Sequence, residues 1–175
     1  MEEVKRIVIT GPESTGKTNI ASYLATKFNS IWIPEYARYY IENLKAKYDY
    51  SDIENIARKQ VEDYHHYSRN ASGLVIFDTW LIITKVWFQK LYNKYPPWME
   101  ESIRNLKIDL YLLCTPDIEW KPDPLRENPG KKREILFNAY ESEIKMTGAP
   151  YGIVKGSGKS RYESAERIVE QNLKI

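Results

Sequence analysis

Eight consecutive residues near the amino terminus combine glycine, lysine and threonine at a spacing suited to phosphate chemistry. From Gly11 to Thr18 the chain reads GPESTGKT, which fits the pattern GxxxxGK[ST]. The glycines allow a bend in which consecutive amide N–H groups face one concavity, at the positive end of the following helix. Lys17 adds a charge for the β and γ phosphates, and the Thr18 hydroxyl is an oxygen ligand for Mg²⁺. The motif predicts a site for ATP or GTP with Mg²⁺, formed by Gly11, Glu13, Ser14, Thr15, Gly16, Lys17 and Thr18.

The sequence on either side of this loop favours phosphate binding over a glycine-rich turn with an incidental lysine. An apolar run, Val4–Ile9, predicts a strand directly before the loop. After the loop, Ile20, Leu24 and Phe28 recur every four residues without glycine or proline, which predicts an amphipathic helix. Strand, loop and helix therefore follow in the order that phosphate binding requires.

Acidic residues follow two further apolar runs. Asp78 comes directly after Leu74–Phe77, the Walker B pattern, in which the acid organises Mg²⁺ through its water shell. The alternative is a strand that ends in a helix cap, a role open to Asp78 or to Thr79. After the second expected strand, Glu35 and Arg38 lie three residues apart, on one face of a helix, where both could face a nucleotide cleft. The alternative for these two residues is an ordinary surface ion pair.

The segment Lys121–Arg133 combines prolines, a glycine and five basic side chains without a periodic pattern, which is typical of a lid. We expect Arg126 and Arg133 to reach the transferring γ-phosphoryl group, because a planar guanidinium suits that charge. A solvated loop is the alternative, whereas a domain boundary is disfavoured because too little chain follows for a second core. Further on, the turn Gly156–Ser160 either contacts the nucleotide base through Gly156 or simply connects a strand to a helix.

Five short apolar runs alternate with longer segments of helical periodicity, which predicts an α/β fold with a parallel sheet and crossover helices. The expected strands are Val4–Ile9, Ile31–Ile33, Leu74–Phe77, Leu110–Cys114 and Tyr151–Val154. The further expected helices are Glu35–Lys47, Asp52–Arg69, Leu81–Tyr92, Lys132–Met146 and Tyr162–Leu173, with a short helix after Pro96-Pro97. We expect Ser51 or Asp52 to cap the second of these helices.

Composition narrows the class of protein. The 175 residues suit a single domain (1–175) with one active site, and a formal charge of +2 predicts small-molecule partners rather than nucleic acid or membrane. No apolar run approaches the roughly 18 residues of a spanning helix, so we expect a cytoplasmic protein. Cys114 is the lone cysteine, and we expect it in the core rather than in catalysis. The sequence indicates no particular oligomeric state.

Taken together, the motifs resemble one known family, the ribosylnicotinamide kinase domain of NadR-type proteins, over nearly the whole chain. The resemblance rests on Gly11–Thr18, Glu35-Tyr36-Ala37-Arg38, Gln60, Asp78-Thr79-Trp80, Trp87, Asp109–Leu113, Pro116-Asp117, Trp120, Asp123, Arg126, Arg133, Gly156 and Arg161. It implies a P-loop NTPase fold, a three-layer sandwich with a five-stranded parallel sheet in the nucleoside-kinase-like order 2-3-1-4-5, and a lid. The chain departs from the family in having no room for a helix-turn-helix or adenylyltransferase domain and no HxGH-like motif. We therefore expect a standalone kinase domain.

The resemblance implies transfer of the γ-phosphate of ATP to the 5′-hydroxyl of nicotinamide riboside, which gives nicotinamide mononucleotide for NAD salvage. Lys17 and Thr18 would then hold phosphate and Mg²⁺, and Asp78 would order the metal waters. Arg126 and Arg133 would steady the transferring group.

The same resemblance assigns Glu35 or Asp78 to accept the hydroxyl proton, with Glu35 preferred and Arg38 as its orienting partner. Nicotinamide riboside carries a pyridinium cation, which favours aromatic faces and carboxylates in its pocket. The residues expected to bind this acceptor are Glu35, Tyr36, Arg38, Trp80, Trp87, Trp120 and Asp123.

Two other functions fit the phosphate site. One is a P-loop kinase of another nucleoside or nucleotide, because a fold does not choose its substrate. The other is a nucleotide-hydrolysing switch protein whose shape is read by a protein partner. The basic lid and the lack of a guanine-selecting NKxD sequence argue against the switch.

Overall fold

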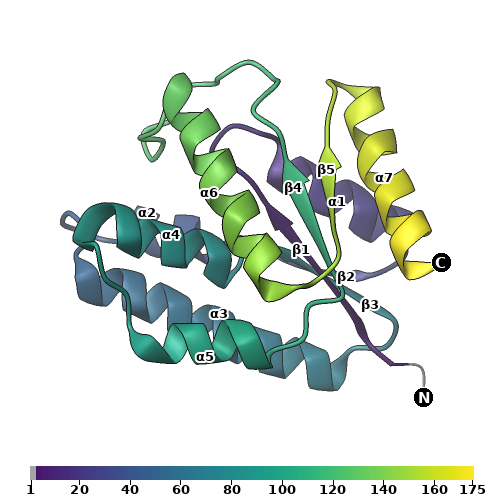
Figure 1. The fold of residues 1–175 in the computed structure, drawn as a ribbon, viewed down its shortest axis with the longest axis horizontal. Coiled ribbons are helices and arrows are strands. Elements are labelled where there is room, and N and C mark those ends of the chain that lie inside the picture. Colours follow the sequence, from purple (N-terminus) through teal and green to yellow (C-terminus); the bar gives the residue numbers. More distant parts are fainter. Residues whose placement is uncertain (1–2) are drawn as a thin grey trace.

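The computed structural model describes residues 3–175, which are built around a five-stranded sheet (Figure 1). Its strands are β1 (Lys5–Thr10), β2 (Ile31–Ile33), β3 (Leu74–Asp78), β4 (Leu110–Cys114) and β5 (Tyr151–Val154). All of these strands pair in parallel, in the order β2-β3-β1-β4-β5. The expected fold class and strand order are confirmed.

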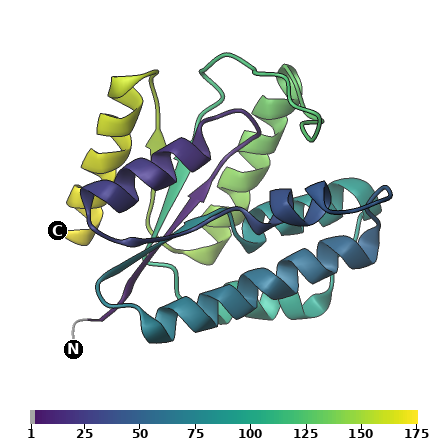
Figure 2. The same cartoon turned by 180° about the vertical axis from the view of Figure 1, so that it is seen from behind.

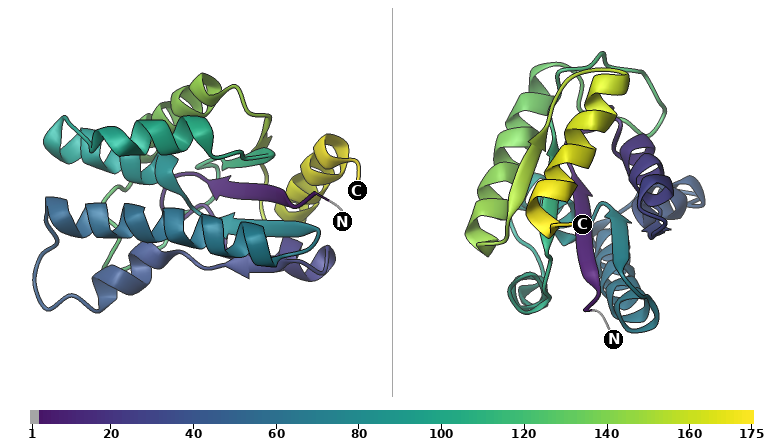
Figure 3. Two further views of the ribbon diagram at one scale, coloured as in Figure 1. Left: turned by 90° about the horizontal axis from the view of Figure 1, so that it is seen from below. Right: turned by 90° about the vertical axis from the view of Figure 1, so that its right-hand side faces the viewer.

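Helices connect the strands and cover both faces of the sheet. They are α1 (Lys17–Lys27), α2 (Tyr36–Glu42), α3 (Tyr50–Asn70), α4 (Leu81–Tyr92), α5 (Pro97–Asn105), α6 (Lys131–Thr147) and α7 (Lys159–Leu173). Helices α1 and α7 pack together on one face (Figure 2), whereas α3, α4, α5 and α6 cover the other (Figure 3). No helix within residues 3–175 combines the length and the apolar character that crossing a membrane requires.

The alternation of side chains along the central strand explains the two layers. Val8 packs into the apolar cluster beneath α3, α4, α5 and α6, whereas Ile7 and Ile9 pack into the cluster beneath α1 and α7. The neighbouring strands β3 and β4 are buried along their whole length. Strands with helices on both faces appear in a sequence as unbroken apolar runs, and for that reason the sequence revealed them.

Helix α3 begins earlier than expected because its cap lies upstream. The Asp49 carboxylate accepts hydrogen bonds from the amides of Ser51 (2.8 Å) and Asp52 (3.1 Å), and the Asp52 carboxylate accepts one from the Asp49 amide (2.8 Å). This reciprocal arrangement is a capping box. The prediction of Ser51 or Asp52 as the cap was therefore wrong by two or three positions.

The segment between β4 and α6 arches away from the end of the sheet at which the strands terminate (Figure 1). Residues 121–130 are irregular, but α6 begins at Lys131. The expected lid and the expected helix Lys132–Met146 overlapped at Lys132 and Arg133, and the structure places both residues in the helix. The carboxyl terminus, at the end of α7, lies on the side of the molecule away from this segment (Figure 3).

Candidate active site

The loop between β1 and α1 has the bend that phosphate binding requires. Gly11 packs so closely on β4 that a Cβ atom at this position would lie 2.8 Å from the Cys114 carbonyl oxygen. Ser14 and Gly16 have φ angles of 57° and 77°, which turn the backbone toward the start of α1. Gly16 adopts this region without strain, whereas Ser14 is strained there, as residues at functional sites often are.

Lys17 lies across this loop. Its Nζ atom donates a hydrogen bond to the Pro12 carbonyl at 2.9 Å, and the Thr15 hydroxyl donates to the same oxygen at 2.8 Å. Phosphate oxygens are charged acceptors and form stronger hydrogen bonds with an ammonium group than a carbonyl does. Lys17 is therefore held close to the loop and free to exchange a weak partner for a stronger one.

Asp78 ends β3 and is joined to the start of α1 by a short hydrogen bond. Thr18 Oγ1 donates to Asp78 Oδ2 at 2.6 Å, and the other carboxylate oxygen is buried without a hydrogen-bond partner in the described part of the chain. Burial, assisted by the charge of Glu35 and opposed by Thr18 and Lys17, raises the pKa of Asp78 to about 6. Mg²⁺ prefers such oxygen ligands and keeps waters and phosphates as its other partners. The Thr18–Asp78 pair therefore fits a Mg²⁺ site.

A cleft of about 500 Å³ opens beside the phosphate loop. Its walls come from the loop, α2, α3, α4, the segment 121–130 and α6. In open parallel sheets, ligands bind beyond the carboxyl ends of the strands, where this cleft lies. It brings together residues that the sequence singled out in distant segments, namely Lys17, Thr18, Glu35, Arg38, Trp87, Asp123 and Arg126.

Glu35 and Arg38 both line the cleft, but they do not form the expected pair. Arg38 forms ion pairs with Glu42 at 3.2 Å and with Asp123 at 3.1 Å. Among the residues that the structure describes, Glu35 forms no ion pair. Arg38 therefore joins α2 to the lid segment and does not orient Glu35.

Glu13 holds the lid segment to the phosphate loop. Its Oε2 atom accepts hydrogen bonds from the amides of Glu127 at 3.0 Å and Asn128 at 2.9 Å. Its Oε1 atom accepts a further bond from the Asn128 side chain at 3.1 Å. Glu13 lines the cleft, as a nucleotide contact should, but its carboxylate faces the lid.

The two arginines predicted at the transferring phosphate lie in different places. Arg126 lines the cleft, and its guanidinium donates to the Lys121 carbonyl. Arg133 is 8% exposed and donates to the carbonyls of Ser14 (3.3 Å) and Ile118 (3.0 Å), outside the cleft lining. Arg133 therefore contacts the phosphate loop outside the cleft lining, and its role at the transferring phosphate stays a prediction.

Trp87 is the predicted tryptophan that does line the cleft. Tyr48 packs edge-on against it, with ring centroids 4.9 Å apart, and the Tyr48 hydroxyl donates to Glu127 at 3.0 Å. Sequence reasoning missed Tyr48 and Glu127. Tyr48 lies in an irregular segment before α3, where no motif or periodicity marks it.

Three other aromatic residues predicted to bind the acceptor lie outside the cleft lining. Trp80 is 1% exposed and stacks on Tyr64 in the core, with ring centroids 5.7 Å apart. Trp120 lies under the Arg133 guanidinium, at 5.7 Å, and Tyr36 packs among tyrosines of α2. The structure does not bring these three side chains into the cleft lining, because residue type alone does not show which way a side chain faces, and their contact with the acceptor stays a prediction.

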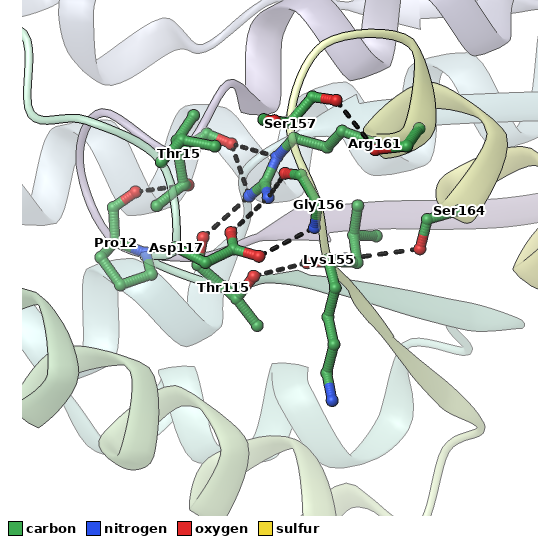
Figure 4. A network of polar contacts seen from close by, with 12 residues as sticks. Pro12, Thr15, Thr115, Asp117, Lys155, Gly156, Ser157, Arg161 and Ser164 are labelled. Carbon is green, nitrogen blue, oxygen red and sulfur yellow. Dashed lines mark hydrogen bonds and ion pairs between the residues drawn. The ribbon is translucent and has the colours of Figure 1, made fainter.

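Behind the phosphate loop, the turn between β5 and α7 is held by one arginine (Figure 4). Arg161, in the first turn of α7, pairs with Asp117 at 2.6 Å and donates to the Gly156 carbonyl at 2.9 Å. The Gly156 amide donates to the other Asp117 oxygen at 2.8 Å. Gly156, predicted as a nucleotide contact, is not in the cleft lining, and sequence reasoning gave Arg161 no role.

Comparisons with known proteins agree with this arrangement. Residues 6–161 match a family described as an AAA domain. The trifunctional NAD biosynthesis/regulator protein NadR of Escherichia coli K12 is 27% identical over 127 residues, which are 70% of this chain and 31% of that protein. A crystal structure of NadR in complex with NR is 26% identical, with a TM-score of 0.81, over 99% of this chain and 52% of that one. A NadR structure with NAD and AMP-PNP is 25% identical, with a TM-score of 0.77, over 99% and 50%.

The chain spans about a third of the curated relative and about half of each NadR structure. The expected resemblance is confirmed over the phosphate loop and the sheet alike, because the aligned regions contain both. The chain belongs to the AAA-domain family and is similar, over nearly its whole length, to one part of NadR.

Proposed function

We propose that this protein is a P-loop kinase that transfers the γ-phosphate of ATP to the 5′-hydroxyl of nicotinamide riboside, giving nicotinamide mononucleotide. The observation that carries the proposal is the cleft. One opening is bounded by the phosphate loop, by the carboxylate of Glu35 and by the aromatic pair of Tyr48 and Trp87. The similarity to a NadR structure in complex with NR supports the choice of acceptor.

In this proposal the phosphate loop holds the nucleotide tail. The loop amides bind the phosphates, and the Lys17 ammonium exchanges the Pro12 carbonyl for β and γ phosphate oxygens. Thr18 and Asp78 are the residues that would hold Mg²⁺, which when bound neutralises charge on those oxygens. Burial of Asp78 makes its charge costly in the absence of a cation, so the site favours a metal partner.

In this proposal Glu35, which lines the cleft, accepts the hydroxyl proton. The 5′-oxygen forms its bond to the γ-phosphorus as the bond to the bridging oxygen of ADP breaks, and Glu35 takes the proton. Arg126 spreads the charge of the transferring group. The phosphoryl group thus ends on the nucleoside, and ADP leaves.

The aromatic wall receives the nicotinamide ring. Trp87 offers a ring face, and Tyr48 is oriented by its bond to Glu127. A pyridinium cation is attracted by aromatic faces and by nearby carboxylates, which Glu127 and Asp123 supply. A neutral base would gain less from the same surroundings.

An ADP-release assay tests the proposal with Mg·ATP and a panel of acceptors. The panel comprises nicotinamide riboside, thymidine, adenosine and nucleoside monophosphates, with the product identified by mass spectrometry. We expect the highest kcat/KM with nicotinamide riboside. Faster turnover of another acceptor would overturn that substrate, and slow hydrolysis unaffected by any alcohol would instead indicate a nucleotide-hydrolysing switch.

A further inference from the structure

Two buried arginines outside the cleft lining bond to main-chain carbonyls of the phosphate loop. Arg133 of α6 donates to the Ser14 carbonyl at 3.3 Å. Arg161 of α7 donates to the Thr15 carbonyl through Nε at 3.1 Å and through Nη2 at 2.9 Å. Neither guanidinium lines the cleft. Helix α7, which carries Arg161, packs with α1 on the face of the sheet opposite α3, α4 and α6, the helices that line the cleft.

Arg161 is the more fully engaged of the two. An arginine side chain has five N–H donors, and Arg161 makes five hydrogen bonds, to Thr15 twice and to Thr115, Asp117 and Gly156 once each. Its relative exposure is 4%. In Figure 4 the guanidinium lies between the loop and the β5–α7 turn, and its bonds reach both.

The geometry of the peptide bond links these contacts to phosphate binding. In a trans peptide the carbonyl of one residue and the N–H of the next point in opposite directions. A carbonyl of Thr15 held behind the loop therefore directs the amide of Gly16 to the front.

We infer that Arg161 is a positioning residue for the phosphate loop, which holds the Gly16 amide toward the phosphate chain by fixing the Thr15 carbonyl. The inference rests on the proposed nucleotide binding. Lysine cannot replace this side chain, because its single ammonium cannot reach partners on two sides. Asp117 holds Arg161 in place: burial acts against its charge, but hydrogen bonds from Thr115, the Gly156 amide and Arg161 lower the pKa of Asp117.

Arg161→Lys tests the inference through nucleotide affinity measured by calorimetry. We expect the Kd of Mg·ATP to rise roughly tenfold or more, the effect of losing hydrogen bonds to a charged group. Magnesium tripolyphosphate, which has no base, can be measured as a competitor of a fluorescent nucleotide. Its affinity should fall by the same factor as that of Mg·ATP. The KM of the nucleoside should stay unchanged.

Arg6→Lys is the matched control. Arg6 also pairs with an aspartate, Asp109, at 3.5 Å and donates to a carbonyl, that of Val4. It lies at the start of β1, far along the strand from the loop. Both variants should lose stability to urea. Only Arg161→Lys should lose nucleotide affinity.

Several results would overturn the inference. One is a folded Arg161→Lys protein that binds Mg·ATP within twofold of the wild type. Another is a weaker affinity for Mg·ATP with an unchanged affinity for tripolyphosphate. That result would indicate that Arg161 acts on the nucleotide base through the turn between β5 and α7. If Arg161→Lys does not fold, Asp117→Asn takes its place, with an expected rise in Kd of about fivefold from one lost charged bond, and unchanged affinity would then refute the inference. Absence of Mg·ATP binding by the wild type would instead refute the proposed function.

Discussion

The two halves of the cleft are held together in different ways. In the phosphate half, buried arginines and the Thr15 hydroxyl bond to main-chain carbonyls, with exposures of 4% for Arg161 and 8% for Arg133. In the acceptor half, the lid is joined to α2 by the Arg38–Asp123 ion pair, whose side chains are 38% and 23% exposed. Main-chain anchors suit a ligand that never varies, whereas exposed side-chain pairs can adjust. If the proposed function holds, the phosphate half carries the chemistry of transfer and the acceptor half selects the substrate.

The largest effect that separates the halves is expected from Lys17→Ala. The variant loses the ammonium that stabilises charge on the phosphates, so kcat should fall by about 10³-fold. Its urea midpoint should match the wild type, because Lys17 gives up only a bond to the Pro12 carbonyl. Lys27→Ala, at the other end of α1, is the control and should keep full activity. Near-normal turnover by Lys17→Ala would contradict the assignment of Lys17 and the phosphate loop to phosphoryl transfer.

Asp78→Asn should lower Mg²⁺-dependent activity and raise the free energy of unfolding at neutral and alkaline pH. Below about pH 4 the carboxyl is protonated in folded and unfolded protein alike, and between pH 4 and the folded pKa of about 6 the folded state binds the extra proton. The free energy of unfolding of the metal-free wild type should therefore fall as pH rises through this window. At pH 8 the variant avoids the cost and should be more stable by up to about 3 kcal/mol, at about 1.4 kcal/mol per pKa unit. Urea titrations at pH 4 and pH 8 measure the difference.

Asp109→Asn is the contrasting control for that experiment. Asp109, in contrast, accepts bonds from the amide and guanidinium of Arg6, so its loss should destabilise the protein. Mg²⁺-dependent activity should fail in Asp78→Asn and survive in Asp109→Asn. Equal stability of Asp78→Asn and wild type at pH 8 would show that the carboxylate is not held at a cost for metal binding.

The phosphate half was also the half that the sequence could reveal. Its amides belong to one short contiguous motif, and the buried strands appear as apolar runs, so the loop and the strands followed from local pattern. The order of the strands followed from the resemblance to NadR-type kinase domains. The acceptor half is assembled from segments far apart in the chain. Trp80 and Trp87 are seven residues apart and of one type, yet Trp80 is buried in the core and Trp87 lines the cleft. The hydrogen-bond partners of Arg161 are residues 15, 115, 117 and 156, which the fold brings together from separate segments. No local sequence pattern predicts these contacts.

Trp87→Ala should alter the acceptor half alone. Loss of a stacking face costs about 1–3 kcal/mol per base, so the KM of nicotinamide riboside should rise about 5-fold to 150-fold. The KM of ATP should not change. Trp98→Ala is the control, because Trp98 packs on Arg58 and bonds to Glu54 outside the cleft. An equal rise in both KM values of Trp87→Ala would contradict the division between the halves.

The smallest effect is expected at the Arg38–Asp123 pair that closes the acceptor half. Exposed ion pairs contribute at most about 1 kcal/mol, so a double-mutant cycle of Arg38→Ala and Asp123→Asn should give a coupling below that value, or about fivefold in the KM of the nucleoside. The coupling should weaken in 1 M salt, where the screening length falls to about 3 Å. The Arg58–Glu54 pair of α3, at 2.6 Å, is the control and should not affect KM. A coupling that is larger and independent of salt would mean that the lid is held as firmly as the phosphate loop, because only a desolvated pair resists screening.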